Sequence, residues 1–452
     1  MGATGRDANA FDIGVVGGGP AGSFAALLFA RAGRSVVLID SDTAKPRIEG
    51  LSPRVAALFA RHGLDPQALG IGPRVTRRSF WSGTAETGNG EHLVERQAFD
   101  RALRSAASQA GAHFIAAQVK TIETGNEGWR VLCLDDGEQI AVRRAIDARG
   151  RRAPMASERV RGPATLTVGG WLSSDAASAA TTTVPCRDGW LWHADFGDGR
   201  AWLQASFDGK AEAGGVDLAA RVEAMLGSDE ARAAFGRRLS CPADLLARNA
   251  DTVLAAPELD PSHIRIGDAA VGLDPLSGHG MFWAISSALA AVPVIAALDE
   301  GTPEAIDLAK RFYAERIADT FWRQARVGRD FYRLEERFAD APYWAARRAF
   351  PDDLPSHAEG AGLSIGRAVI VENNRLCERA VVRTEQNPAG VAFVAGIPIV
   401  PVIEEIGRRG ACGAGLEDLQ KTCFPEASRD QAAALFGWLD SQGLIARNSD
   451  HS

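Results

Sequence analysis

The stretch FDIGVVGGGPAGSFAALLFARAGRSVVLID, Phe11–Asp40, decides the fold. It opens with a short apolar run at Asp12–Val16, which is typical of a buried parallel strand. A glycine-rich turn follows, and a helix is expected from about Pro20 to Ala32. Val36–Ile39 then predicts a second strand. This order predicts the first strand–helix–strand unit of a doubly wound α/β domain.

The turn carries the glycine spacing G-x-G-x-x-G at Gly17, Gly19 and Gly22. Gly17 permits the tight turn, Gly19 lets a pyrophosphate approach the backbone, and Gly22 lets the helix pack close to the strand. The helix points its free N–H groups and positive end at the phosphates. Asp40 ends the second strand, where a carboxylate can hold a ribose hydroxyl and disfavours a 2′-phosphate. The stretch therefore predicts FAD or NAD as the ligand, rather than NADP.

Composition sets wider limits. The chain has 452 residues, of which 46% are hydrophobic, so two or three domains are expected. A net charge of -7 argues against broad nucleic-acid binding. Residues 1–10 are polar and lack a signal-peptide core, and no apolar run is expected to span a membrane. We therefore expect a cytoplasmic protein without nucleic-acid or membrane partners.

Cysteine and histidine usage indicates neither disulfides nor a metal site. The cysteines contain no C-x-x-C motif, and the eight histidines show no ligand spacing. We therefore predict reduced thiols and no bound metal. The six cysteines are Cys133, Cys186, Cys241, Cys377, Cys412 and Cys423.

Four regions are expected along the chain. Residues 1–153 form the first part of the dinucleotide-binding domain. Residues 154–260 form a substrate domain, because alternating stretches such as TLTVGGWLSS predict antiparallel strands. Residues 261–340 return to the first domain and continue into a long amphipathic helix from about Glu304 to Phe338. Residues 341–452 form a linker and a small α+β, winged-helix-like domain, with a final strand expected at Leu444–Ile445.

Several separated motifs carry a resemblance to a known superfamily. They are GGGPAG at 17–22, Arg96 before FD at 99–100, DARGR at 147–151, and GDAAVGLDPLSGHGM at 267–281. Together they resemble the FAD-dependent, group A monooxygenases of the para-hydroxybenzoate hydroxylase fold, a superfamily that includes tryptophan halogenases and geranylgeranyl reductases. The resemblance implies FAD as cofactor and a Rossmann-like FAD domain interleaved with an antiparallel-sheet substrate domain.

The resemblance also implies residue roles. Asp268 would contact the ribityl or pyrophosphate region of FAD, Arg96 the pyrophosphate, and the backbone of Val119 the adenine. Pro275 would stand close to the flavin face. Gly278, His279 and Gly280 would begin a helix beside the flavin pyrimidine ring, where N–H groups and a positive dipole end stabilise negative charge. The expected FAD contacts are Gly17, Gly19, Pro20, Ala21, Gly22, Asp40, Ser41, Arg96, Val119, Asp268, Pro275, Gly278, Gly280 and Met281.

The chemistry implied by the resemblance is hydroxylation of an electron-rich aromatic ring through a flavin C4a-hydroperoxide, with O2 as co-substrate. NAD(P)H as a transient reductant, or a partner reductase, would supply electrons, because the chain has no second G-x-G-x-x-G motif. The halogenase pattern is broken: no lysine lies between Lys45 and Lys120, and Ser277 and Gly278 occupy the expected Glu and Ser positions. The cysteine of the geranylgeranyl-type reductases is absent from KPRIEGLSP.

The extra module at 366–452 favours a macromolecular substrate. The layout is similar to flavoprotein monooxygenases that hydroxylate a tryptophan within a precursor protein, during tryptophylquinone formation in bacterial quinohemoprotein amine dehydrogenases. A small-molecule halogenase, a geranylgeranyl-reductase-like oxidoreductase and a non-catalytic flavin-binding assembly factor stay open as alternatives. Glu49 and His279 are the candidate catalytic residues, with His193 and Asp195 as further pocket candidates, because a general base would help remove the ring proton.

Overall fold

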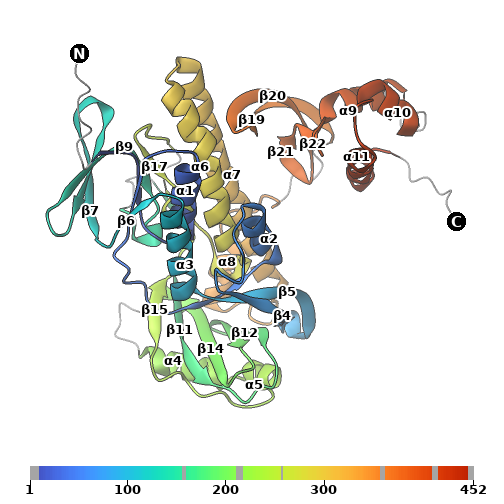
Figure 1. Ribbon diagram of the computed structural model, residues 1–452. Coiled ribbons are helices and arrows are strands. Elements are labelled where there is room, and N and C mark those ends of the chain that lie inside the picture. The colour runs from blue at the N-terminus through green and yellow to red at the C-terminus, as the bar shows by residue number, and fades with distance from the viewer. Residues whose placement is uncertain are drawn as a thin grey trace. The chain divides into compact units, whose positions relative to one another are not determined.

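The computed structural model describes residues 10–154, 159–209, 217–255, 258–356, 362–409 and 416–445. These divide into two compact units (Figure 1). The first comprises Met1–Ile295 and Tyr313–Leu354, and the second comprises Ala296–Phe312 and Pro355–Ser452. Cys412 lies outside the described residues. The region boundaries expected from the sequence, at 153, 260 and 340, stay predictions.

A mixed sheet forms the core of the predicted dinucleotide-binding region. Its described strands run in the order β6-β2-β1-β9-β8-β7, with β17 also paired to β9. The central strands β6, β2, β1, β9 and β17 are parallel, as expected for a doubly wound fold, whereas β8 and β7 are antiparallel. The strands are β1 Ala10–Val16, β2 Val36–Ile39, β6 His113–Ile115, β7 Val119–Thr124, β8 Arg130–Leu134, β9 Gln139–Asp147 and β17 His263–Arg265.

A second, mostly antiparallel sheet has the order β15-β11-β14-β13-β12-β4-β5-β3. The predicted strands of the substrate region are present, but β3, β4 and β5 come from residues 48–95, before that region begins. β4 joins them to the rest by pairing parallel to β12. The strands are β3 Ile48–Leu51, β4 Ile71–Ser79, β5 Glu86–Glu95, β11 Thr165–Ser173, β12 Ala180–Cys186, β13 Gly189–Asp195, β14 Arg200–Asp208 and β15 Leu246–Asn249.

The two faces of this second sheet pack against different elements. Leu191, Leu203 and Phe207 point to one face and pack with residues of α4 and α5. Trp190 and Trp192 point to the other face, because successive strand side chains alternate. There they pack with Tyr332 of the long helix α7 and with Tyr343 and Trp344 of α8. We call this second cluster the aromatic core.

Among the described residues, eight helices precede residue 355, and of these α6 and α7 lie partly in the second unit, at Ala296–Phe312 (Figure 1). They are α1 Pro20–Arg31, α2 Pro53–Arg61, α3 Arg96–Gln109, α4 Leu218–Leu226, α5 Asp229–Phe235, α6 Gly280–Glu300, α7 Pro303–Leu334 and α8 Pro342–Ala349. Short 3-10 turns occur at η1 Trp81–Gly83, η2 Asn126–Gly128, η3 Gly150–Arg152, η5 Gly267–Ala269 and η6 Pro275–Ser277. A small sheet of β10 Val160–Arg161, β16 Val253–Leu254 and β18 Val271–Gly272 completes the unit. The long predicted helix is confirmed as α7, which ends at Leu334 rather than Phe338.

The expectation that no stretch is apolar and long enough to cross a membrane is wrong for α6. This helix has 21 residues and a mean hydropathy of 2.0 over its most apolar 18-residue window. In the structure 72% of that window is buried. A helix that is apolar on all sides can be either a buried helix in the core of a large domain or a helix that spans a bilayer. The burial of α6 within the protein accounts for its composition.

The second unit has the predicted α+β character. Its strands form the antiparallel sheet β19-β20-β21 and the pair β22–β23, and helices follow the strands in sequence. The expected strand at Leu444–Ile445 is not formed: Leu444 follows a turn after α11 and packs against the unit's own core. The elements are β19 Ser364–Glu372, β20 Arg375–Thr384, β21 Asn387–Val391, β22 Phe393–Val394, β23 Ile397–Pro398, α9 Ile399–Arg409, α10 Leu416–Cys423 and α11 Arg429–Ser441.

Candidate functional site

The glycine turn between β1 and α1 has room for no side chain at two of its positions. Gly17 has a φ of +108°, and a Cβ there would lie 2.5 Å from the carbonyl oxygen of Ala148. A Cβ on Gly22 would lie 1.9 Å from the carbonyl oxygen of Gly17. A Cβ on Gly19 would meet only Arg96 Nη2, at 4.0 Å, among the described residues. The backbone at Gly19 is therefore open to a ligand, beside a guanidinium group.

The first turn of α1 adds hydrogen-bond donors to this cradle. α1 starts at Pro20 with Gly19 as its N-cap and has no side-chain cap. The first N–H groups of a helix have no intrahelical partner, so those at the start of α1 are available to phosphate oxygens. Pro20, Ala21 and Gly22 are buried against the sheet. These features fit the diphosphate of FAD.

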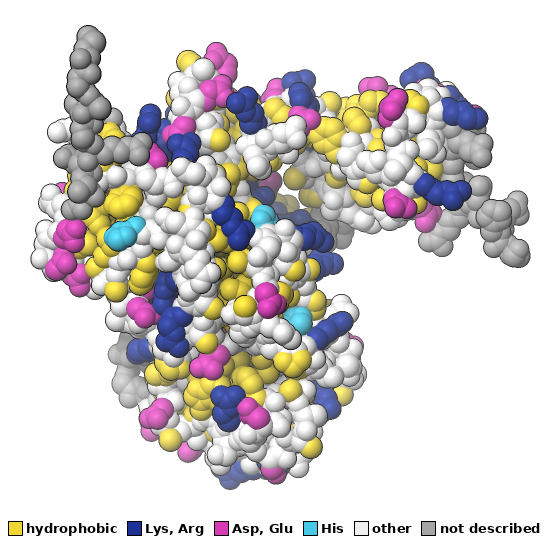
Figure 2. Space-filling model, in the orientation of Figure 1, with side chains coloured by type: hydrophobic (Ala, Val, Ile, Leu, Met, Phe, Trp, Pro, Cys, Tyr) yellow, Lys and Arg dark blue, Asp and Glu magenta, His cyan; other side chains and the backbone are white. Residues whose placement is uncertain are grey.

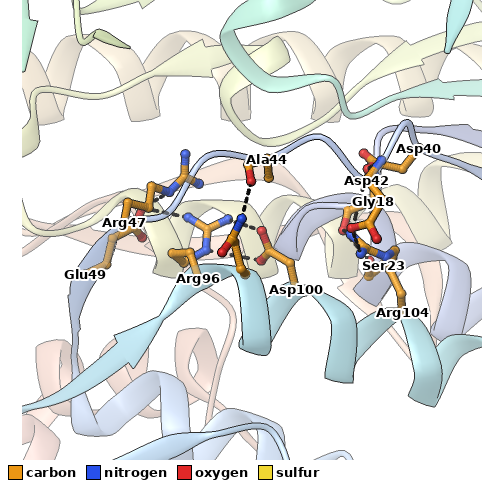
Figure 3. Close-up of polar contacts among 11 residues, drawn as sticks. Gly18, Ser23, Asp40, Asp42, Ala44, Arg47, Glu49, Arg96, Asp100 and Arg104 are labelled. Atoms are coloured by element: carbon orange, nitrogen blue, oxygen red, sulfur yellow. Dashed lines mark hydrogen bonds and ion pairs between the residues drawn. The ribbon is translucent and has the colours of Figure 1, made fainter. Parts of the chain in front are cut away.

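The carboxylate of Asp40 lies at the end of β2, where the sequence places it. Its Oδ2 accepts a hydrogen bond from the Gly18 N–H at 2.6 Å, and its Oδ1 accepts one from the Asp42 N–H at 2.8 Å. Ser41 Oγ lies 2.9 Å from Thr43 Oγ1. Arg104 Nη1 lies 3.8 Å from Asp40 Oδ1 and donates to the Gly18 carbonyl (Figure 3). Asp40 thus braces the glycine turn, and its role toward a ribose stays a prediction.

Arg96 begins α3 and holds two carboxylates at once (Figure 3). Its Nη1 lies 2.6 Å from Glu49 Oε1, and its Nη2 lies 3.1 Å from Asp100 Oδ2. Arg47 Nε also lies 2.9 Å from Glu49 Oε1. Burial raises the pKa of Glu49, but the guanidinium groups of Arg96 and Arg47 outweigh it and lower this pKa to about 2. A carboxylate this acidic is a weak base, so the geometry favours an ion-pair role for Glu49.

Two arginines of this cluster were missed by the sequence analysis. Arg47 precedes β3, and Arg104 lies on α3 two helical turns beyond Arg96. Arg96, Asp100 and Arg104 are spaced by four residues and all three are buried, so they share one face of α3. That spacing was visible in the sequence, where Arg96 was the one residue of the three given a role. Arg47 carries no comparable signal.

The two motifs DARGR and GDAA meet in space. Arg151 Nε lies 3.2 Å from Asp268 Oδ2, and a Cβ on Gly150 would lie 3.8 Å from Asp268 Cβ. The N–H of Gly267 donates to Ser287 Oγ on α6 at 2.8 Å. Asp268 keeps a side-chain exposure of 34%, which leaves it accessible to a ligand. Val119 begins β7 and its carbonyl oxygen accepts a long hydrogen bond, 3.4 Å, from Arg149.

The turn before α6 presents a second open backbone. Gly278 has a φ of +62°, and among the described residues no atom lies within 4 Å of a Cβ built on Gly278 or Gly280. Pro275 lies in η6 and Met281 is buried in the first turn of α6. His279 is exposed, and desolvation together with neighbouring arginines lowers its pKa, although a hydrogen bond with the Ser277 backbone acts in the opposite direction. The helix start fits a flavin ring that gains negative charge.

His193 and Asp195 are not brought to this turn. His193 Nδ1 lies 3.3 Å from Asp195 Oδ2, and the His193 ring packs 5.3 Å from the ring of Phe235 on α5. His193 therefore faces α4 and α5, on the side of the sheet opposite the aromatic core. Leu276 of the turn packs against the aromatic core instead. The structure thus separates these two candidates from Pro275, Gly278 and His279.

The chain is similar to a protein family and to several solved structures. The profile of the lycopene cyclase protein family matches residues 12–171. A solved structure described as the peptidyl tryptophan dihydroxylase QhpG, essential for tryptophylquinone cofactor biogenesis, is 32% identical and has a TM-score of 0.79. That likeness covers 96% of this chain and 100% of the other. The flavin-dependent halogenase CmlS has a TM-score of 0.72 and 17% identity, and the likeness covers 97% of this chain and 96% of the other.

Two curated relatives extend the comparison. The menaquinone reductase of Mycobacterium tuberculosis is 35% identical over 157 residues, which is 32% of this chain. This match spans only 38% of the length of that relative. A protein of Marinomonas mediterranea named as an FAD-dependent oxidoreductase, LodB, is 24% identical over 75% of this chain and 97% of its own length. The likeness to CmlS, at 17% identity, shows the fold alone, whereas the likeness to QhpG combines 32% identity with coverage of almost the whole chain.

Proposed function

Because this chain belongs to the family of FAD-dependent flavoprotein monooxygenases that includes the peptidyl tryptophan dihydroxylase, we propose that it hydroxylates a tryptophan side chain. The substrate is a protein or peptide, and the reaction belongs to the formation of a tryptophylquinone cofactor. The observation that carries this proposal is the likeness over the whole length, at 32% identity and a TM-score of 0.79. No other likeness reported above combines this identity with this coverage.

FAD, when bound, supplies the redox chemistry that activates O2. The residues of this chain bind and orient it. The glycine turn and Arg96 hold the diphosphate, Asp268 holds the chain between diphosphate and ring, and the first turn of α6 stabilises negative charge on the ring. The aromatic core packs against Leu276 and excludes water from that side. NAD(P)H or a partner reductase supplies electrons, and the reaction takes place in the cytoplasm.

Reduction of a small molecule is the second candidate. It is favoured by the 35% identity to menaquinone reductase, but that likeness is confined to 157 residues. Halogenation is supported by the shared fold, but the identity to the halogenase is only 17%. Ser277 and Gly278 also stand where the halogenase pattern requires other residues. The region 366–452 does not decide between these, because the likenesses to the dihydroxylase and to the halogenase cover 96% and 97% of this chain.

The surface gives no reason to add a nucleic-acid partner. On the face drawn in Figure 2, basic and acidic side chains are interspersed, and no broad basic field is visible. Nucleic-acid binding relies on such a field to neutralise phosphates. A protein substrate requires no uniform charge, so this face is compatible with the proposal.

Intact-protein mass spectrometry tests the function. The yellow protein is mixed with NAD(P)H, air and the precursor subunit of a tryptophylquinone enzyme. We expect the precursor to gain ~16 or ~32 Da, one or two oxygen atoms, and a precursor with the target tryptophan changed to phenylalanine to gain nothing. A gain of ~2 Da on a quinone or isoprenoid, with no oxygen added to any precursor, would establish the reductase instead.

A further inference from the structure

Asp274 lies directly before Pro275 and has unusual partners for a carboxylate. Its Oδ1 accepts the backbone N–H of Leu276 at 2.9 Å, which caps η6. The hydroxyl of Tyr332 lies 3.1 Å from Oδ1 and 3.3 Å from Oδ2. Among the described residues Asp274 makes no ion pair. Within the part of the chain that the structure describes, the one side chain that hydrogen-bonds to this carboxylate is therefore a phenol.

Tyr332 connects this carboxylate to a second phenol. The Tyr332 hydroxyl lies 3.3 Å from the hydroxyl of Tyr343, and both tyrosines are at most 3% exposed. The guanidinium carbon of Arg347 lies 3.6 Å from the centre of the Tyr343 ring. Arg347 donates to the Tyr343 carbonyl and to Thr165 Oγ1, so it does not pair with Asp274. The chain Tyr343–Tyr332–Asp274 thus ends at the turn before α6.

The surroundings favour the protonated form of Asp274. Desolvation by the surrounding protein raises its pKa, while Arg347, the Leu276 N–H, Tyr332 and Arg151 act against it without overcoming it. These are the groups that face Asp274 from α8, η6, α7 and η3. Burial also raises the pKa of Tyr343 to about 12 and that of Tyr332 well above its usual value, so both phenols stay protonated. Of these three hydrogen-bonded groups, Asp274 is the one that can change its charge without ionising a phenol.

We propose that Asp274, held by Tyr332, is the positioning residue that sets the charge beside the flavin and makes the reduction of bound FAD depend on one additional proton. The proposal rests on the proposed function only in placing the flavin ring next to Pro275 and the start of α6. Asp274 acts through the turn and through its charge.

The direction of the effect follows from electrostatics. With the flavin ring bound against Pro275, an ionised Asp274 carboxylate would oppose the negative charge that arrives on reduction, and a protonated carboxyl would not. The reduction potential of bound FAD should therefore carry an inflection at the pH where Asp274 ionises. Tyr332 donates to the ionised form and holds that inflection lower than it would otherwise be.

The test is the reduction potential of the FAD-loaded protein, measured by equilibration with redox dyes between pH 5 and pH 9. In Asp274→Asn the inflection should disappear and the potential at high pH should rise. In Tyr332→Phe the inflection should persist but move to higher pH, by about one unit, because a hydrogen bond to the carboxylate is lost.

Tyr343→Phe is the matched control, because it removes the other hydroxyl of the same buried pair without touching Asp274. It should leave the inflection within about 0.3 units of the parent. Equal shifts in the two tyrosine variants would show a packing effect and overturn the proposal, as would an unchanged inflection in Asp274→Asn. If Asp274→Asn fails to retain FAD, the test is the pH of the inflection in Tyr332→Phe compared with that in Tyr343→Phe.

The two proposals can fail separately. The potential is measured on bound FAD without any substrate, so a protein that hydroxylates no tryptophan still gives the measurement. Conversely, a chain that hydroxylates the precursor but shows no proton-linked inflection would retain the function and lose the role of Asp274.

Discussion

Glu49 holds its charge between two guanidinium groups, and this makes stability depend on pH. The pKa of Glu49 is lowered from 4.5 to about 2, so its contribution is complete above pH 4.5 and is lost as the pH falls from 4.5 toward 2. Glu49→Gln should lower the free energy of unfolding by roughly 2 kcal/mol at pH 7, after allowance for partial solvent screening. Denaturant unfolding at pH 7 and pH 3.5 measures the difference, which should shrink at the lower pH.

Asp42→Asn provides the control for that experiment. Asp42 also pairs with an arginine, Arg104, but its side chain is 46% exposed. An exposed ion pair contributes little, so this variant should change the free energy of unfolding by less than about 0.5 kcal/mol. A loss from Glu49→Gln that is the same size at both pH values would mean that Glu49 acts through packing rather than through charge.

The sequence allowed some residues of the site to be predicted and concealed others. Gly17, Gly19 and Gly22 are predictable because the need for a glycine at each position arises from residues close by in the turn. Arg47 was missed because its partner Glu49 acquires meaning only when Arg96, far along the chain, folds beside it. Burial and charges from distant segments determine the pKa values and ion pairs of such residues, and a local sequence pattern reveals neither.

At the scale of the element, the contact between α1 and β1 depends on Gly22. A Cβ there would lie 1.9 Å from the Gly17 carbonyl oxygen, so Gly22→Ala must displace the helix start from the turn. We expect FAD occupancy of the purified protein, read from its flavin absorbance, to fall at least about tenfold, because a misplaced helix end loses its phosphate contacts.

Gly437→Ala is the matched control, since this glycine also lies within a helix, α11. No described atom lies within 4 Å of a Cβ there. This substitution should leave FAD occupancy unchanged and raise helix stability by about 0.5–1 kcal/mol. Full flavin content in Gly22→Ala would contradict the close approach of α1 to the turn.

Helices and strands were predictable where the local sequence pattern favours the same structure as the neighbouring strands with which the segment pairs. The parallel strands β1 and β2 and the helix between them form as expected, because the apolar runs and the glycines point to one arrangement. β4 was not foreseen: its sequence IGPRVTRRS carries four exposed polar or charged side chains, Arg74, Thr76, Arg77 and Arg78, and reads as a loop. It becomes a strand because β5 and β12 supply hydrogen bonds from both sides.

At the scale of the whole molecule, the predicted FAD contacts all lie in Met1–Ile295 of the first unit. Deletion of residues 355–452 should therefore leave FAD bound, while hydroxylation of a precursor protein falls at least about tenfold through loss of docking contacts. Flavin content and the mass of the precursor measure the two effects. Oxidation of free tryptophan is the control, and it should change less than about threefold. Undiminished hydroxylation of the precursor would remove any docking role for the second unit.

The crossed pairing of β4 has a consequence for the growing polypeptide. β4 at residues 71–79 pairs with β12 at residues 180–186, and β9 pairs with β17 at residues 263–265. A ribosome releases the first partner of each pair long before the second. β4 therefore lacks β12 until about residue 186 has emerged, and β9 lacks β17 until about residue 265 has emerged. An open strand edge recruits other chains. Translation that stops early would leave fragments prone to aggregate, so the order of synthesis, as well as the final fold, shapes how this protein is made.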